Sequence, residues 1–184
     1  SDFTSSPTSM PTKEDYAAML KKAEAGDAKS QFTIAIPPYS FLDPSSTMKE
    51  KGDLHEKWLT LSANQGYLPA VTNLGKEYLL GMDYFYQGHG GQPDVKKGMK
   101  MLHDAGSKGE YLAYCYIGGY YRQMKQPIEA YAWYSVCEST GEKSLSNKLY
   151  EKAIIESELK GQDWEKAKKL TKEYIAKYGK NNTN

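Results

Sequence analysis

The side chains that most often carry out catalysis are few in this sequence, and their spacing supports no active site. The three histidines, His55, His89 and His103, lack the spacing of a metal site, and neither HExxH nor CxxC occurs. No GxSxG motif occurs, and the glycines beside His89 have neither the preceding strand nor the following lysine of a phosphate-binding loop. Nothing in the sequence brings Asp53 and Glu56 together as an acid and a base. We therefore predict a non-catalytic protein without a metal or a cofactor.

The two cysteines could form a disulfide. Cys115 and Cys137 lie at equal distances from residue 126, in the turn between two predicted helices. Residues placed symmetrically on antiparallel helices lie at the same level, so the sulfur atoms can meet if both side chains face inward. Two cysteines in an exported protein typically pair, whereas two buried thiols are the alternative in a helical core. The spacing favours a Cys115–Cys137 disulfide.

Protein recognition is the chemistry that the aromatic side chains favour, since the chain contains 16 tyrosines, 4 phenylalanines and 3 tryptophans. Aromatic rings supply rigid contact area, and tyrosine is common in binding hot spots. We predict partner-binding residues in two loops and one helix: Tyr39 and Phe41, then Tyr84, Phe85, Tyr86 and His89, and finally Tyr111, Tyr114 and Tyr120. The alternative for each of these side chains is packing against the molecule's own helices.

The elements that must position these side chains show an internal repeat. At distances of four, nine and twelve residues, Gly66 is followed by Ala70, Gly75 and Tyr78, and Gly109 by Ala113, Gly118 and Tyr121. Gly26 begins a weaker copy, and the three glycines lie 40 and 43 residues apart, a period that indicates stacked supersecondary units. The spacing predicts helical hairpins. The first glycine of each copy would take a positive φ between two helices, and the small residue at the ninth position would let a second helix approach closely.

This pattern resembles the Sel-one-like repeat (SLR) family, a relative of the tetratricopeptide repeat. The matching residues are Trp58, Ala63, Gly66, Ala70, Leu74, Gly75, Tyr78 and Gly81, then Ala105, Gly109, Ala113, Ile117, Gly118 and Tyr121. The resemblance covers roughly residues 15–178 and is specific over residues 56–141. It implies an all-α fold, a short right-handed α-solenoid of antiparallel helix pairs.

We expect a flexible tether rich in Ser, Thr and Pro, residues 1–12, followed by one solenoid domain, residues 13–180. The predicted units cover about residues 13–52, 53–95, 96–125 and 126–160, and a capping helix follows at residues 162–178, with Asp163 as its N-cap. Two segments depart from the family pattern. Three prolines predict an insertion loop over residues 36–52, and a second loop replaces the short turn after Gly81.

Composition bears on the partner and on the compartment. The 24 basic and 23 acidic residues nearly cancel, which gives no indication of a nucleic-acid partner. No apolar run reaches the eighteen or so residues of a membrane span. The tether is typical of a segment that follows a signal peptide or a lipid anchor, and a membrane tether through a removed N-terminus would fit it. We expect a periplasmic or secreted protein, and a cytoplasmic protein is the alternative.

The resemblance implies that the chain binds another protein. Similar small exported bacterial proteins include immunity proteins, which bind and neutralise a secreted toxic effector such as a type VI secretion lipase. This is the function that we predict. A general scaffold or adaptor in signalling or envelope assembly is one alternative, and a secreted virulence factor that binds host protein is another. The sequence does not name the partner, because a fold does not by itself imply a function.

Overall fold

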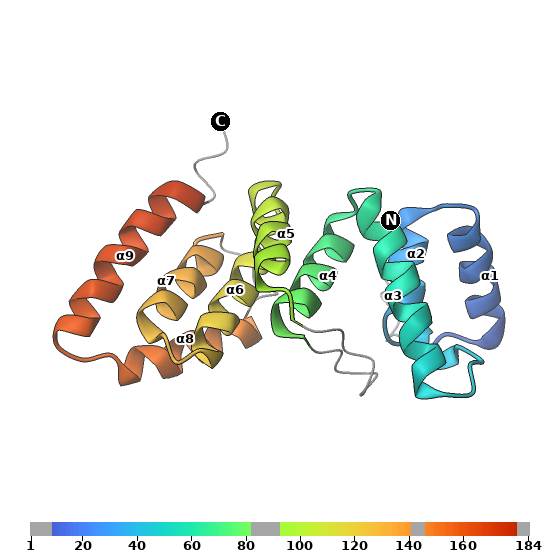
Figure 1. Ribbon diagram of the computed structural model, residues 1–184, viewed down its shortest axis with the longest axis horizontal. Helices are drawn as coiled ribbons and strands as arrows, with labels where there is room; N and C mark the ends of the chain where they lie inside the picture. The colour runs from blue at the N-terminus through green and yellow to red at the C-terminus, as the bar shows by residue number, and fades with distance from the viewer. Residues whose placement is uncertain (1–8, 82–92, 141–145, 180–184) are drawn as a thin grey trace, which may run out of the picture. The chain divides into compact units, whose positions relative to one another are not determined.

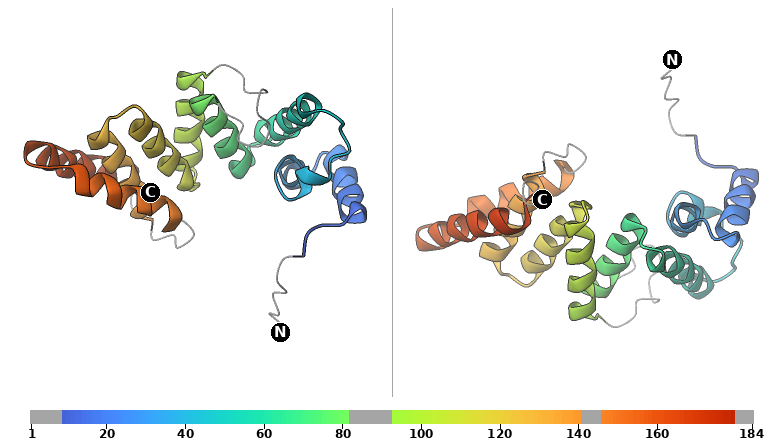
Figure 2. Two further views of the ribbon diagram at one scale, coloured as in Figure 1. Left: turned by 90° about the horizontal axis from the view of Figure 1, so that it is seen from below. Right: turned by 90° about the horizontal axis from the view of Figure 1, so that it is seen from above.

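The computed structural model describes residues 9–81, 93–140 and 146–179, and across these residues the chain is helical and contains no strand (Figures 1 and 2). The elements are α1 (Lys13–Glu24), α2 (Ala28–Ala35), the 3-10 helix η1 (Tyr39–Leu42), α3 (Met48–Asn64), α4 (Leu68–Leu80), α5 (Val95–Ser107), α6 (Leu112–Gln123), α7 (Pro127–Glu138), α8 (Ser146–Glu158) and α9 (Gln162–Tyr178). The described residues divide into two compact units, residues 9–70 and residues 71–81 with 93–179. The all-α class is as predicted.

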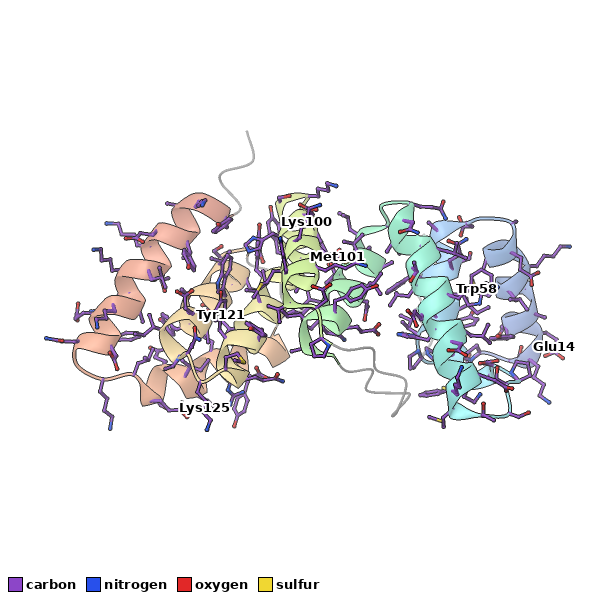
Figure 3. The ribbon with its side chains drawn as sticks, viewed as in Figure 1. Glu14, Trp58, Lys100, Met101, Tyr121 and Lys125 are labelled. Carbon is purple, nitrogen blue, oxygen red and sulfur yellow. A yellow bond between two sulfur atoms is a disulfide. The ribbon has the colours of Figure 1, made fainter. Side chains whose placement is uncertain are left out.

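In the first unit, α2 packs against both α1 and α3 (Figure 1). Ile34 of α2 and the neighbouring Trp58 and Leu59 of α3 are buried between these helices. Trp58 extends from α3 toward the other two helices in Figure 3. The hydroxyl of Ser62 also donates a hydrogen bond of 2.7 Å to the carbonyl oxygen of Ala28, which joins α3 to the start of α2. Apolar burial and a polar contact therefore hold these helices together.

The segment between α2 and α3 is shorter than predicted. Thr47 begins α3 with a capping box, in which its hydroxyl accepts a hydrogen bond from the backbone of Glu50 and the Glu50 carboxylate accepts one from the backbone of Thr47. Residues 48–52 therefore belong to the helix, and the predicted insertion over residues 36–52 is wrong at its C-terminal end. Part of the remaining segment is ordered as η1.

In the second unit, α7 packs against α6, α8 and α9, and α6 also packs against α5. This central position explains why every residue of α7 from 130 to 137 is buried. Pro127 occupies the first helical position, where its missing N–H would have no partner in the helix. Leu102 of α5, Ile117 of α6 and Ile155 of α8 contribute to the same core.

The first glycines of the repeat pattern lie in turns between helices. Gly26, Gly66 and Gly109 have φ values of 100°, 79° and 99°. A side chain at such positive φ values would crowd the neighbouring backbone, and glycine has no side chain to do so. The predicted role of these three glycines is confirmed.

The small residues at the ninth position also have their predicted role in the second unit. A Cβ atom added at Gly75 would lie 3.0 Å from the Cβ of Met101, and one added at Gly118 would lie 3.1 Å from the Cγ of Tyr134. Both distances are shorter than ordinary carbon–carbon contacts. Glycine therefore allows α5 to lie close to α4, and α7 to lie close to α6.

The start of the last helix differs from the prediction. Gly161 stands at the N-cap of α9 with a φ of 58°, and no side chain caps the helix. Asp163 lies inside the first turn, so its predicted capping role is wrong. Its carboxylate remains near the positive end of the helix dipole, where a negative charge is favourable. The division of the chain into repeat units within a single domain stays a prediction.

Candidate partner-binding surface

Four helices of the second unit bring five aromatic rings together. His103 comes from α5, Tyr114 from α6, Trp133 from α7, and Tyr174 and Tyr178 from α9. We call these five residues the aromatic cluster. The packing of α7 against both α6 and α9 positions it, because α7 carries the central ring.

The ring of Trp133 lies at the centre of the cluster. Its centroid is 5.7 Å from that of Tyr114 in a stacked arrangement and 5.1 Å from that of His103 in an edge-on arrangement. The rings of Tyr174 and Tyr178 lie 4.7 Å and 5.0 Å from it. His103 also reaches Tyr178, at 5.5 Å. These separations are in the range at which aromatic pairs attract one another beyond their burial.

The cluster has a buried base and an accessible rim. Tyr114 is 2% exposed and Trp133 is 4% exposed, whereas His103, Tyr174 and Tyr178 are half-buried. Gly106 of α5 makes room for the base, since a Cβ there would lie 2.4 Å from the Cζ of Tyr114. Tyr114 and Trp133 therefore form a buried base, and the rings of His103, Tyr174 and Tyr178 form a rim that is partly exposed to solvent.

Burial also sets the electrostatics of the cluster. It lowers the pKa of the His103 imidazole, a shift that the charge of Lys177 adds to and that of Asp104 opposes. It raises the pKa of the Tyr114 hydroxyl to about 12. Burial, together with the hydrogen bond of 2.9 Å that the Tyr174 hydroxyl donates to Glu129, raises the pKa of Tyr174 as well. Burial therefore favours the neutral forms of His103, Tyr114 and Tyr174.

Two polar groups of the cluster region have no hydrogen-bond partner among the described residues. They are the indole N–H of Trp133 and the hydroxyl of Thr171, which lies on α9 one turn before Tyr174. Buried polar groups in folded proteins usually have a partner, because leaving one unpaired costs about 1–3 kcal/mol.

A comparison with solved structures identifies the fold. A protective antigen present in uropathogenic Escherichia coli strains, whose crystal structure displays an SLR fold, matches with a TM-score of 0.65 and 22% sequence identity. The match covers 92% of this chain and 34% of that protein, so the chain spans about a third of its length. This chain has an SLR fold. No protein family model and no curated protein sequence matches it.

The disulfide within this SLR fold is the predicted one. Cys115 of α6 is bonded to Cys137 of α7, with the two Cα atoms 5.4 Å apart. The cysteines are 1% and 0% exposed, so both side chains face inward, as the prediction required. The bond lies between two of the helices that carry the aromatic cluster, so it contributes to holding those helices together.

The predicted tyrosines of α6 have three different surroundings in the SLR fold. Tyr114 belongs to the buried base of the cluster, where a partner could reach it only if the surrounding helices moved apart. Tyr111 is half-buried just before α6, with its ring 6.4 Å from that of Tyr114, so it adjoins the cluster. Tyr120 is half-buried and packs edge-on against Tyr121 at 5.4 Å. Their role in binding stays a prediction.

The predicted loop residues are only partly covered by the structure. Tyr39 and Phe41 lie on η1 of the first unit, where Tyr39 is half-buried and Phe41 is 59% exposed. Four further candidates, Tyr84, Phe85, Tyr86 and His89, lie outside the described residues. Phe41 is thus the most accessible of the predicted aromatic residues that the structure describes.

Sequence reasoning did not select His103, Trp133, Tyr174 or Tyr178 as site residues. Tyr174 and Tyr178 are four residues apart and share one stripe of α9, which is a weak signal. Nothing in the sequence associates them with Trp133 or His103. The cluster is visible only once the helices have been packed.

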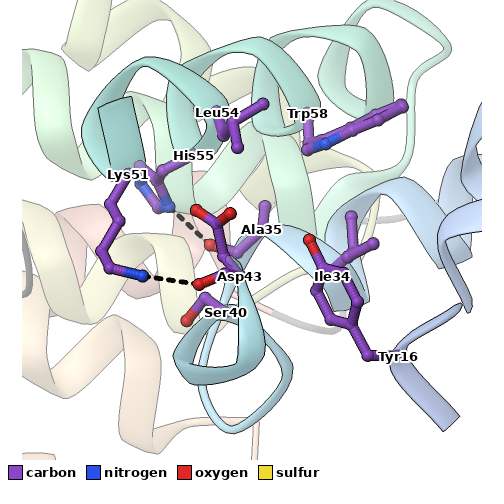
Figure 4. Close-up of a pocket in the computed structure, with 9 residues that line it drawn as sticks. All are labelled: Tyr16, Ile34, Ala35, Ser40, Asp43, Lys51, Leu54, His55 and Trp58. Carbon is purple, nitrogen blue, oxygen red and sulfur yellow. Dashed lines mark hydrogen bonds between the residues drawn. The ribbon is translucent and has the colours of Figure 1, made fainter. Parts of the chain in front are cut away.

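A small pocket in the first unit, with a volume of about 10 Å³, is the alternative site (Figure 4). His55 and Lys51 from α3 border it, and each contacts a backbone carbonyl: the Nδ1 of His55 lies 2.6 Å from the oxygen of Ala35, and the Nζ of Lys51 lies 2.7 Å from that of Asp43. The buried hydroxyl of Ser40 has no hydrogen-bond partner among the described residues. The volume suffices for about one water molecule, which excludes an organic substrate.

Two further properties bear on function. Among the described residues, no group of three or more His, Cys, Asp and Glu side chains is arranged to hold a metal ion. In the same part of the chain, no helix combines the length and the apolarity needed to cross a membrane.

Proposed function

We propose that this chain is a non-catalytic module that binds another protein through the rim of the aromatic cluster. The observation that carries the proposal is the half-buried rim of His103, Tyr174 and Tyr178 on a buried base of Tyr114 and Trp133. Rings that packing already holds lose little conformational entropy when a partner covers them. Helical repeat folds use surfaces of this kind for protein binding.

The finer proposal is that the partner is a secreted toxic effector, such as a type VI secretion lipase, and that the chain is an exported immunity protein. The Cys115–Cys137 disulfide supports an oxidising compartment such as the periplasm, because disulfides form and persist there. Neutralisation would require only that the bound chain cover the catalytic site of the effector.

A second candidate function is a secreted factor that contacts host proteins. The SLR-fold protein that this chain resembles is described as a protective antigen of uropathogenic strains. A chain of the same fold that acts outside the cell would be in an oxidising environment, where the Cys115–Cys137 disulfide persists. The two candidates differ in the origin of the partner, bacterial or host.

The first experiment identifies the partner and maps its site. The oxidised chain serves as bait in extracts of the native organism, mass spectrometry identifies the captured protein, and calorimetry measures its affinity after purification. We expect the double variant His103→Ala/Tyr178→Ala to bind about tenfold more weakly or worse, because it removes two rim side chains. Tyr150→Ala is the matched control, since Tyr150 is 70% exposed on α8 of the same unit and has no part in the cluster.

The same purified partner tests the finer proposal. An effector whose activity falls to zero at a stoichiometric amount of the chain would support an immunity protein. A partner of host origin would instead support the secreted factor. If the cluster variant binds the partner as tightly as the unmodified chain, the aromatic cluster is a structural feature and the proposed site is wrong.

A further inference from the structure

Two lysines and one ring of the aromatic cluster lie on the same face of α5. Lys96, Lys100 and His103 are four and three residues apart, so they share one stripe of the helix. Both lysines are exposed, and neither makes an ion pair among the described residues. The stripe therefore leads from two free ammonium groups to a half-buried ring of the rim.

The C-terminal end of α9 adds a third lysine to this region. The ring of Tyr178 lies 5.5 Å from that of His103, which brings the end of α9 beside α5. The exposed Lys177 follows Tyr174 by three residues, and its ammonium lies 5.1 Å from the centroid of the Tyr178 ring. Its charge is close enough to lower the affinity of His103 for a proton.

No carboxylate among the described residues makes an ion pair with Lys96, Lys100 or Lys177. The charge of Asp104 acts on His103 and opposes the effect of Lys177. The exposed Asp104 and Glu173 lie one turn from Lys100 and Lys177 and offset part of their charge. The carboxylate of Glu129 accepts the hydrogen bond from Tyr174. The three lysines therefore present ammonium groups beside aromatic rings with no ion-pair partner among the described residues, and we call Lys96, Lys100, Lys177 and the rim the basic aromatic face.

We propose that the basic aromatic face binds an acidic segment of a partner protein, one in which Asp or Glu side chains alternate with an aromatic or apolar anchor. This inference rests on the proposed function and names the chemistry of its partner. Covering three lysines with an uncharged surface would cost desolvation energy without return, whereas carboxylates would pair with them. The rings of the rim would hold the anchor between those pairs.

A nucleic acid is the other polyanion that a row of lysines could bind, and the chain favours it less. Its charge is nearly balanced, with a pI of about 7.6, and Arg122 is its one arginine. Nucleic-acid-binding domains usually have a strongly basic pI and depend on arginine for bidentate contacts with phosphates and bases. An acidic peptide needs only the few point charges that the lysines provide.

The experiment uses the full oxidised chain and a labelled synthetic peptide of alternating Glu and Tyr residues. Fluorescence anisotropy measures its affinity at low and high salt, and a peptide with Gln in place of Glu is the chemical control. We expect the Gln peptide to bind about tenfold more weakly or worse, and we expect salt to weaken binding of the Glu peptide. An equal affinity for the two peptides would overturn the proposal.

Two matched charge reversals locate the site. Lys100→Glu/Lys177→Glu alters the proposed face, and Lys169→Glu/Lys172→Glu introduces the same change of charge at exposed lysines elsewhere on α9. We expect about a tenfold loss of peptide affinity in the first variant alone. An equal loss of peptide affinity in both variants would show that the peptide is attracted by the overall charge of the protein and does not bind at the proposed face. Lys100→Glu by itself, within α5, preserves the test if the change near the end of α9 disturbs folding.

Two further measurements separate this inference from the proposed function. If a labelled single-stranded oligonucleotide binds more tightly than the Glu peptide at the same salt, the face binds a nucleic acid and the proposed acidic segment is wrong. If the captured partner loses affinity for the His103→Ala/Tyr178→Ala variant but not for Lys100→Glu/Lys177→Glu, the cluster binds protein and the acidic segment is wrong. If neither variant affects the partner, both the proposed site and this inference fail.

Discussion

Gly98 of α5 and Leu79 of α4 lie so close that position 98 has no room for a side chain. A Cβ atom at Gly98 would lie 2.6 Å from the backbone nitrogen of Leu79 and 2.7 Å from the carbonyl oxygen of Gly75. Both neighbours are backbone atoms, which cannot rotate away as a flexible side chain can. This contact sets how closely α5 approaches α4.

Replacing Gly98 with alanine is therefore expected to destabilise the fold by about 1–3 kcal/mol, although alanine favours a helix more than glycine does. Gly119→Ala is the control within α6, because a Cβ there would meet only the hydroxyl oxygen of Tyr134, at 3.4 Å. We expect this second change to stabilise the fold by up to about 1 kcal/mol. Urea unfolding measures both. If both substitutions changed the free energy of unfolding in the same direction, the close contact at Gly98 would not determine the effect of Gly98→Ala.

Loss of the Cys115–Cys137 disulfide is expected to lower the free energy of unfolding by about 3 kcal/mol, since the bond closes a loop between cysteines 22 residues apart. Thermal unfolding of the oxidised chain is compared with that of a chain unfolded, reduced and refolded in reductant. The variant Cys115→Ala/Cys137→Ala should unfold at the same temperature with or without reductant. A fully reduced chain that unfolds at the temperature of the oxidised chain would contradict the prediction.

Lys125, which is labelled in Figure 3, has a φ of 57° in the turn between α6 and α7. Its N–H bonds the carbonyl of Arg122, and the next N–H bonds that of Tyr121, a helix ending that usually contains glycine. Lys125→Gly should raise the free energy of unfolding by up to about 1 kcal/mol, because it relieves the left-handed strain. Lys108→Gly, at a φ of −97°, should lower it instead. If Lys125→Gly and Lys108→Gly lower the free energy of unfolding equally, the prediction for Lys125 is wrong.

Acid should destabilise the fold partly through His103. Burial lowers the pKa of its imidazole below 6.5, so the unfolded chain binds this proton more readily than the folded chain does. The stability contributed by the neutral ring is present above about pH 6.5 and is lost as the pH falls through the folded pKa. His103→Phe keeps a ring without the titrating group, so its stability should fall less between about pH 7 and pH 5. Identical pH profiles from chemical unfolding would contradict this.

A separate prediction concerns Tyr84, Phe85 and Tyr86, which lie outside the described residues. Replacing Tyr84, Phe85 and Tyr86 with alanine should weaken binding of the captured partner and leave the melting temperature nearly unchanged, because aromatic residues in a glycine-rich sequence favour recognition. Calorimetry and thermal unfolding of the same variant test this. A large fall in melting temperature with unchanged affinity would make these rings structural.

The sequence by itself determined the features that depend on a few neighbouring residues. Gly26, Gly66 and Gly109 end helices at positive φ because turns of this shape exclude a side chain. Asp27, the residue directly before α2, caps this helix by accepting a hydrogen bond from the amide of Ser30. The disulfide also followed from spacing, since the two cysteines are symmetric about one short turn. Local geometry leaves few alternatives in each case.

Tertiary structure alone decided the rest. His103, Trp133 and Tyr178 lie far apart in the sequence on three helices, and only the packing of α7 against its neighbours brings their rings together. The same packing buries Tyr114 and leaves its sequence neighbour Tyr111 at the edge of the cluster. Helical periodicity predicts which residues lie on one face of a helix, but it does not predict which helix faces pack against each other. The candidate surface of this protein lies where faces of several helices pack together.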